Sequence, residues 1–268
     1  MTYQKCELPN GMIIYHLNRH ETKFIYKEIF EEKIYMKHGI SIDKRGVVLD
    51  VGANIGLFTL FVKRLFPDSK IYAFEPAPGL FKILQLNVSQ YGRSVVIFQL
   101  GLSDKKEKAI FTYYPNYSIL SGFRSDSHLD EQVLRSGVYN QLHQSGFGDK
   151  GRLEEAVNLL IKDKLSNKKE FECQLTTISN FIKEYGISRI DLLKVDAEKM
   201  EGNILKGING KDWLKIKQIV MEVHDASRNS ERMIAGLLKA KGFEVIVEEE
   251  QKFKGSGVSN IFAFRTKS

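Results

Sequence analysis

Two acidic side chains and two glycines have the types and spacing of a nucleoside-binding site. Asp50 lies in the apolar run 47–51, Gly52 and Gly56 follow that run, and Glu75 follows the next one. Glycines let the backbone turn sharply and approach a ligand, and an acid after the second strand can accept hydrogen bonds from both hydroxyls of a ribose. A lone Gly-x-x-x-Gly is often only a tight turn, but the added acids predict a nucleoside slot.

The residue between the glycines indicates which nucleoside to expect. A pyrophosphate-binding fingerprint has a third glycine where this chain has Asn54, and no Lys-Ser or Lys-Thr pair follows Gly56 as a P-loop requires. S-adenosylmethionine has no phosphate, and the negative charge of Asp50 suits its cationic amino-acid end. We therefore expect a methyl-donor site. An NAD-dependent oxidoreductase is a disfavoured alternative, and so is a non-catalytic binding module, which would lack the acid–base groups at 222–225.

These acid–base groups are Glu222 and His224, which would serve the methyl acceptor. Two residues apart in a strand, they share one face about 7 Å apart, so we expect them to address one cavity rather than to pair. An imidazole with a pKa of about 6.5 suits removal of an alcohol proton during methyl transfer. The sequence predicts O-methylation with His224 as the base, oriented by Glu222 or Asp196. Tyr26 and Tyr35 are candidates for orienting the substrate from the N-terminal segment.

A metal-assisted mechanism is the alternative on the acceptor side. Carboxylate oxygens are the ligands that Mg²⁺ prefers, and a bound ion would acidify the acceptor hydroxyl. The candidate ligands are Asp196, Glu198, Glu222 and Asp225. Because His224 can act without a metal, we expect none.

A parallel sheet would bring these residues together. The expected strands are 47–51, 70–74, 95–100, 190–195, 218–223, 243–248 and 260–265, and the helices between them are 56–65, 78–90, 177–184, 201–205 and 230–241. This alternation predicts an α/β fold with a seven-stranded, mostly parallel sheet whose last strand is antiparallel. Ligands bind outside the carboxyl ends of such strands. The cofactor-binding residues expected there are Asp50, Gly52, Asn54, Gly56, Glu75, Pro76, Gly101, Leu102, Ser103 and Asp196.

Two segments depart from the alternation within one predicted domain, 1–268. Residues 1–45 form an N-terminal extension, with a hairpin turn at Asn10-Gly11 and an amphipathic helix at 22–30. Residues 114–168 form an insertion with a helix at 153–165. Long insertions in compact domains are usually functional, which predicts a lid or substrate-binding wall. The alternative is a surface elaboration or a contact in a homodimer.

The composition and charge of the chain limit the kinds of partner that it is expected to bind. The chain has 268 residues, is 43% hydrophobic and carries a net charge of +7, which suits an acidic partner. The positive residues are scattered among acids, so nucleic acid is not expected. No apolar run approaches the length of about 20 residues that spans a bilayer, and the N-terminus leads to no signal-peptide core. Cys6 and Cys173 lack metal or redox spacing. We expect a cytoplasmic protein without a membrane partner.

Four motifs together resemble the FkbM-type methyltransferases: Val-Leu-Asp-Val-Gly-Ala-Asn-Ile-Gly at 48–56, Ala-Phe-Glu-Pro at 73–76, Ile-Asp-Leu-Leu-Lys-Val-Asp-Ala-Glu at 190–198 and Val-Met-Glu-Val-His-Asp at 220–225. The resemblance extends over about 48–265. The family's usual Asp-Val-Glu-Gly is Asp-Ala-Glu-Lys here, with Lys199 in place of glycine, which bears on how closely a substrate passes that turn.

Residues 21–30 and 114–122 further resemble the O-methyltransferase domains of bacterial modular polyketide synthases. This resemblance implies S-adenosylmethionine as the donor. It implies as acceptor a hydroxyl of a polyketide intermediate that phosphopantetheine tethers to an acyl carrier protein. The alternative is a stand-alone enzyme that methylates a sugar or small-molecule hydroxyl.

Overall fold

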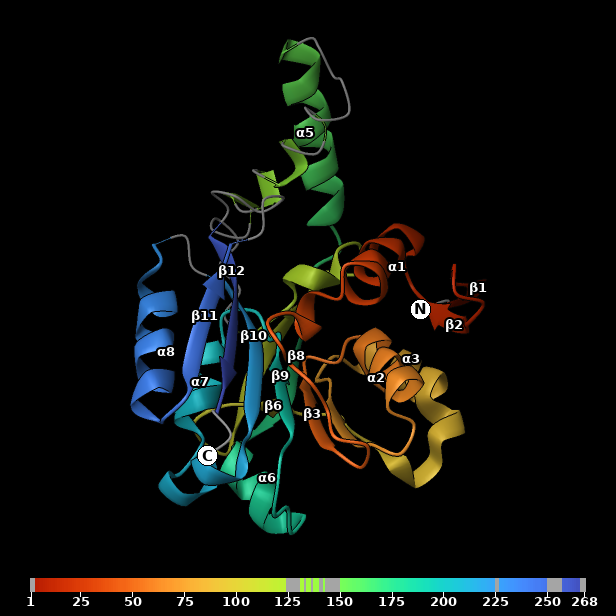
Figure 1. The fold of residues 1–268 in the computed structure, drawn as a ribbon. Helices are drawn as coiled ribbons and strands as arrows, with labels where there is room; N and C mark the ends of the chain where they lie inside the picture. Colours follow the sequence, from red (N-terminus) through yellow and green to blue (C-terminus); the bar gives the residue numbers. More distant parts are fainter. Residues whose placement is uncertain are drawn as a thin grey trace.

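A seven-stranded sheet forms the centre of the computed structural model (Figure 1). The structure describes residues 3–123, 131–132, 134–135, 137–139, 142, 150–224, 227–249 and 257–265. The sheet order is β11 (Glu244–Glu248), β12 (Val258–Phe264), β10 (Gln218–His224), β9 (Leu192–Val195), β3 (Val47–Val51), β4 (Lys70–Phe74) and β5 (Val95–Phe98). Strand β12 is antiparallel to both of its neighbours, and every other pair in this sheet is parallel. The predicted seven strands and the antiparallel last strand are confirmed.

Helices cover both faces of this sheet because its central strands are apolar on both sides. Val48 packs into the core under α2 (Leu57–Leu65) and α3 (Pro78–Val88). The next residue, Leu49, points to the opposite face. That face is covered by α6 (Ile178–Glu184), α7 (Glu201–Lys206) and α8 (Asn229–Ala240). Short turns η3 (Ser89–Ser94) and η5 (Gly210–Lys215) lead into β5 and β10.

A second, smaller sheet was not fully expected. It has the order β6 (Gly101–Leu102), β8 (Lys169–Thr176) and β7 (Glu107–Tyr113). Strand β8 was not predicted, although Phe171, Cys173 and Leu175 alternate with exposed polar residues as in a strand that is buried on one face. The predicted strand 95–100 in fact ends at Phe98, and the chain then turns into β6.

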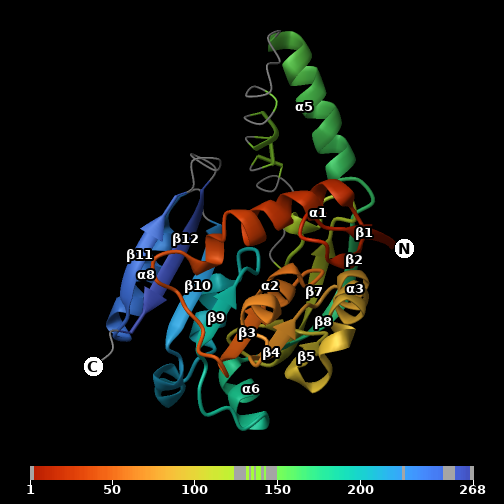
Figure 2. The same cartoon turned by 45° about the vertical axis from the view of Figure 1, so that its right-hand side comes forward.

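The N-terminal extension lies over the carboxyl ends of the parallel strands (Figure 2). It contains β1 (Gln4–Glu7), β2 (Ile13–His16), α1 (Arg19–Tyr26), the π-helical turn η1 (Lys27–Glu31) and η2 (Ile34–Met36). The predicted hairpin is present, with Gly11 at φ +81° in its turn. The Asn18 side chain caps α1 by accepting from the N–H groups of His20 and Glu21. The predicted amphipathic helix is confirmed, but it begins at Arg19 rather than at residue 22.

The insertion has a small core of its own. It contains η4 (Ser118–Leu120) and α5 (Lys150–Lys164), and α5 projects away from the main sheet (Figure 1). Leu153, Val157 and Ile161 of α5 pack against Leu134 and Val138. Residues 124–130 and 143–149, with a few positions between them, lie outside the described residues. In the part of the chain that is described, no helix combines the length and apolar character needed to cross a membrane.

Candidate active site

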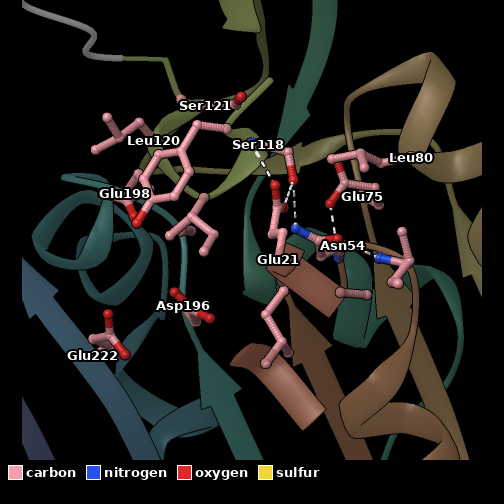
Figure 3. Close-up of a pocket in the computed structure, with 18 of the residues that line it drawn as sticks. Glu21, Asn54, Glu75, Leu80, Ser118, Leu120, Ser121, Asp196, Glu198 and Glu222 are labelled. Carbon is pink, nitrogen blue, oxygen red and sulfur yellow. Dashed lines mark hydrogen bonds between the residues drawn. The ribbon is translucent and has the colours of Figure 1, made fainter. Parts of the chain in front are cut away.

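A cavity of about 470 Å³ opens at the carboxyl ends of β3, β4, β9 and β10. Figure 3 shows Glu75 and Asn54 on one side of it, with Glu198 and Glu222 on the other. Residues of α1, η1, η4 and α5 complete its wall. The cavity therefore joins the two groups of residues that the sequence assigned to donor and acceptor.

The glycine loop has the predicted tight turn, but protein packing also requires its glycines. A Cβ on Gly52, at φ +74°, would lie 1.7 Å from the carbonyl oxygen of Asp196. A Cβ on Gly56, at φ +91°, would lie 2.7 Å from Leu84 Cδ1. Asn54 has φ +51°, a left-handed conformation that asparagine tolerates better than most residues. The loop is thus fitted to its neighbours, and Gly52 and Asn54 also line the cavity.

Glu75 is buried at the donor side of the cavity. Its Oε2 accepts from the Asn54 N–H at 2.9 Å, and its Oε1 accepts from the Ala77 N–H at 2.8 Å. Burial raises the pKa of this carboxyl to about 7, although both N–H groups favour the ionised form. Since a carboxylate has about four lone-pair sites, Glu75 can still accept from ligand hydroxyls.

Asp50 does not line the cavity, contrary to the expected contact with the donor. It is fully buried, its Oδ2 accepts from Thr59 Oγ1 at 2.7 Å, and its Oδ1 lies 3.3 Å from Lys194 Nζ. Asp50 and Lys194 are register partners in β3 and β9, which explains the pairing. Lys194 also donates to the carbonyl oxygen of Gly52 at 2.8 Å. Asp50 therefore acts on the site by holding the lysine that supports the glycine loop.

The remaining predicted donor residues divide into two groups. Pro76, Gly101 and Leu102 line the cavity. Ser103 does not; it is 1% exposed and its hydroxyl donates to Asp104 Oδ1 at 3.0 Å. Apolar side chains surround this end, namely Leu80, Leu100, Leu102, Phe111 and Phe123. They form a wall that suits a flat aromatic base.

On the acceptor side, His224 lies among three carboxylates. Its Nδ1 is 3.0 Å from Glu201 Oε1, and its Nε2 is 2.9 Å from Glu222 Oε1 and 3.3 Å from Glu198 Oε1. The expectation that Glu222 and His224 do not pair directly is wrong, because two long side chains on one strand face can bend toward each other. Glu198, Glu222 and His224 line the cavity, whereas Glu201 supports the ring from behind.

These contacts change the protonation of the cluster. Burial alone would lower the pKa of His224, but Glu198, Glu201 and Glu222 raise it well above its usual value. Burial raises the pKa of Glu198 to about 8, and the positive charge of His224 opposes this rise. The three carboxylates therefore favour the imidazolium form of His224 over the neutral imidazole that the sequence suggested.

Asp196 lines the cavity between the two groups, as predicted. Its Oδ2 accepts from the Tyr35 hydroxyl at 2.9 Å and lies 3.5 Å from Lys194 Nζ. Tyr35 also lines the cavity. Tyr26 does not; it stacks on Phe30 with ring centroids 4.8 Å apart, so the expected contact of Tyr26 with a substrate is not found.

Sequence reasoning missed a hydrogen-bonded link across the cavity (Figure 3). Glu21 of α1 accepts from both the N–H and the hydroxyl of Ser118 in η4. The Asn54 side chain donates to Ser118 Oγ at 3.2 Å. Burial raises the pKa of Glu21. The link joins the extension, the insertion and the glycine loop. Glu21 precedes the predicted helix 22–30, so that prediction gave no signal for the link.

The magnesium alternative stays a prediction. Among the described residues, no group of three or more His, Cys, Asp or Glu side chains is arranged to hold a metal ion. Asp225, a member of the alternative ligand set, lies outside the described residues.

The strand order and the site together define the class I methyltransferase fold. The glycine loop follows β3, the buried acid follows β4, and the antiparallel β12 lies between β11 and β10. Residues 50–245 match the family model described as the methyltransferase FkbM domain, and the chain belongs to this family. The family resemblance of the four motifs is confirmed.

Two curated relatives match nearly the whole chain. It is 36% identical over 263 residues to 31-O-demethyl-FK506 methyltransferase FkbM of Streptomyces tacrolimicus, covering 98% of this chain and 97% of that protein. It is 34% identical over 270 residues to AMB antimetabolite synthetase AmbE of Pseudomonas aeruginosa, and spans 12% of the length of that relative. A crystal structure of methyltransferase FkbM from Methylobacillus flagellatus KT has a TM-score of 0.53 at 10% identity, covering 92% of this chain and 55% of that one. That structure supports the fold alone.

Proposed function

We propose that the chain is an S-adenosylmethionine-dependent O-methyltransferase. The observation that carries this proposal is the single cavity with Glu75 at one end and the Glu198–Glu222–His224 cluster at the other. The donor fits the residues present: Glu75 can accept from a ribose, and the apolar wall around Leu80 and Leu102 suits an adenine. The carboxylates on the opposite side favour a cationic sulfonium.

When bound, S-adenosylmethionine supplies an electrophilic methyl group. The protein's own part is to position the acceptor hydroxyl and to take its proton. Asp196, fixed by Tyr35 and Lys194, faces the junction between donor and acceptor. The cluster around Nε2 of His224 receives the proton. The insertion and α1 exclude water from above, since Leu120, Val138 and Phe24 line the cavity there.

For the acceptor we propose a hydroxyl of a polyketide intermediate on the phosphopantetheine arm of an acyl carrier protein. The name of the S. tacrolimicus relative describes methylation at an oxygen, which supports O-methylation. The match to a small part of the synthetase AmbE supports a domain that works within a larger assembly. The net charge of +7 suits an acidic carrier and its phosphate.

A stand-alone enzyme that acts on a free small-molecule hydroxyl is the second candidate. The observation in its favour is that the chain covers 97% of the S. tacrolimicus methyltransferase, a protein with little beyond this domain.

The test begins with calorimetry of S-adenosylmethionine binding to the wild type and to Glu75→Gln. Mass analysis then compares methylation of a 3-hydroxybutyryl carrier protein with that of free 3-hydroxybutyrate. We expect S-adenosylmethionine to bind and the carrier-bound hydroxyl to be methylated. The methylation rate should fall as salt rises, because at 0.1 M salt the attraction between opposite charges on the two proteins is screened beyond about 10 Å. No binding would refute the methyl-donor site, and equal turnover of the free acid would favour the second candidate. Loss of turnover with EDTA, restored by Mg²⁺, would support the metal-assisted alternative.

A further inference from the structure

The acceptor side contains more carboxylates than a histidine base needs. Glu198 lies in the β9–α7 loop and Glu222 in β10, and both line the cavity. Each has an oxygen within 3.3 Å of Nε2 of His224, while Glu201 is 3.0 Å from Nδ1. Both ring nitrogens therefore face carboxylate oxygens.

This geometry decides the direction of the hydrogen bonds. A carboxylate oxygen accepts hydrogen bonds, so an imidazole with acceptors at both nitrogens is satisfied only when both carry a proton. Such a ring cannot accept another proton. The proton of an acceptor hydroxyl must then go to a carboxylate.

The three carboxylates are not equivalent. Glu201 is buried, does not line the cavity and also accepts from the Lys199 N–H at 3.0 Å. Glu222 has the shorter contact with the ring, 2.9 Å against 3.3 Å for Glu198. A shorter charge-assisted hydrogen bond stabilises the ionised carboxylate more and makes it a weaker base. Glu198 is thus the cavity carboxylate that the imidazolium holds less tightly.

We propose that Glu198 takes the proton of the acceptor hydroxyl, and that His224 is a positioning residue whose imidazolium is itself held by Glu201. This proposal rests on the proposed methyl transfer to oxygen. In the step, the O–H bond breaks and its proton forms a bond with a Glu198 oxygen. The oxygen forms a bond with the methyl carbon, and the carbon–sulfur bond breaks with its electron pair remaining on sulfur. Charge balances, because the carboxylate and the sulfonium become a neutral acid and a neutral thioether.

The surroundings of Glu198 suit this role. Asp196 on its own loop, Glu201 of α7 and Glu222 of β10 disfavour its ionised form, whereas His224 favours it. Tyr117, next to η4, also lines the cavity, and its phenol stays neutral because burial raises its pKa. With burial, these groups bring the pKa of Glu198 to about 8. A base with a pKa near the operating pH is the most effective.

The first experiment measures kcat against pH with the 3-hydroxybutyryl carrier protein and three variants. Glu198→Gln should lower kcat by about 10²- to 10⁴-fold without weakening S-adenosylmethionine, and Glu198→Asp should restore part of the loss. His224→Asn should retain measurable turnover, and the rise of kcat with pH should move to higher pH because the cation that favours ionised Glu198 is gone. The opposite pattern, with Glu198→Gln active and His224→Asn inactive although still binding the donor, would overturn the proposal.

A second measurement needs no turnover. Nitrogen-15 NMR of the wild type with S-adenosylhomocysteine reports the protonation of each histidine ring, and comparison with His224→Asn assigns the signal. We expect His224 to keep both ring protons well above its unperturbed pKa of about 6.5. A ring that becomes neutral near its unperturbed pKa of about 6.5 would overturn the proposal. Calorimetry separates this outcome from failure of the proposed function, in which the donor itself would not bind.

Discussion

Donor affinity should depend on pH through Glu75. The carboxyl is buried, both oxygens contact backbone N–H groups, and its pKa is raised to about 7. Ribose hydroxyls donate hydrogen bonds, so the ionised carboxylate binds them best. The affinity for the donor should therefore rise with pH across neutrality.

The size of the effect follows from this pKa. With a pKa of about 7, about one tenth of the Glu75 carboxyls are ionised at pH 6 and about nine tenths at pH 8. When only the ionised form is competent, the apparent Kd scales with the inverse of its fraction, which gives about a tenfold change over this range. Removing the Glu75 charge altogether should weaken the binding free energy of the donor by about 1.5–3 kcal/mol, or about ten- to a hundredfold in affinity.

Calorimetry with 5′-methylthioadenosine is the appropriate assay. This ligand keeps the adenine and ribose but lacks the amino group of the donor, whose own titration near a pKa of about 7.7–8.0 would confuse the result. Glu75→Gln is the control: it should bind more weakly and show no dependence on pH. Because that variant changes the acceptors of the Asn54 and Ala77 N–H groups, thermal denaturation must show that it is folded. A wild-type Kd that stays constant from pH 6 to pH 8, or an equal slope in a folded Glu75→Gln variant, would refute the reasoning.

Three further predictions concern stability and are measured by thermal denaturation. Gly52→Ala should lower the free energy of unfolding by more than about 3 kcal/mol, since a left-handed alanine costs about 1–2 kcal/mol and its Cβ would also meet a carbonyl oxygen at 1.7 Å. The control is Gly11→Ala, at φ +81° with open space around the Cβ, which should show only the conformational part of this loss. Equal losses in the two variants would contradict the clash at Gly52. The free energy of unfolding should fall as pH rises from about 5 to 9, because Glu75 and Glu198 have folded pKa values above their unfolded ones and the folded state binds more protons in that window; a rise would show that other groups dominate. Ser118→Ala should lower the free energy of unfolding by about 1–3 kcal/mol, because it removes the hydroxyl that donates to the buried Glu21 of α1. It should also speed proteolysis of α1. Unchanged cleavage would mean that this link does not hold the helix in place.

Much of the fold could be predicted because its signals are local. The buried strands 47–51 and 70–74 are short apolar runs, and the helices α2, α3 and α6 begin at or next to a glycine, a proline and a capping threonine, respectively. The small sheet is different. Strand β8 pairs with β7 from more than fifty residues away, and its three alternating apolar residues, Phe171, Cys173 and Leu175, stand among charged and polar ones. Its pairing depends on tertiary contacts that no local window contains.

The sequence predicted which segments meet at the cavity but not which of their side chains face it. The ends of the parallel strands do bring the expected segments together, as the topology requires. Which side chains face the cavity depends on side-chain partners. Asp50 is held by Lys194 across the β3–β9 pair, Ser103 is buried against its neighbour, and Tyr26 is stacked on Phe30. A lysine inside the otherwise apolar strand at 192–195 was the available signal for the first of these.

The two ends of the cavity rely on the same physical device. Burial raises the pKa of both Glu75 and Glu198. Each is also held by groups that favour its ionised form, namely backbone N–H groups for Glu75 and the His224 imidazolium for Glu198. A cationic donor placed between them favours ionisation of both, because opposite charges attract more strongly inside a protein than in water. Donor binding would then convert the donor-side glutamate into a better hydrogen-bond acceptor and the acceptor-side glutamate into a carboxylate that can take a proton. The site would become competent for proton removal when a sulfonium is present, and after methyl transfer the neutral thioether would no longer favour the ionised forms.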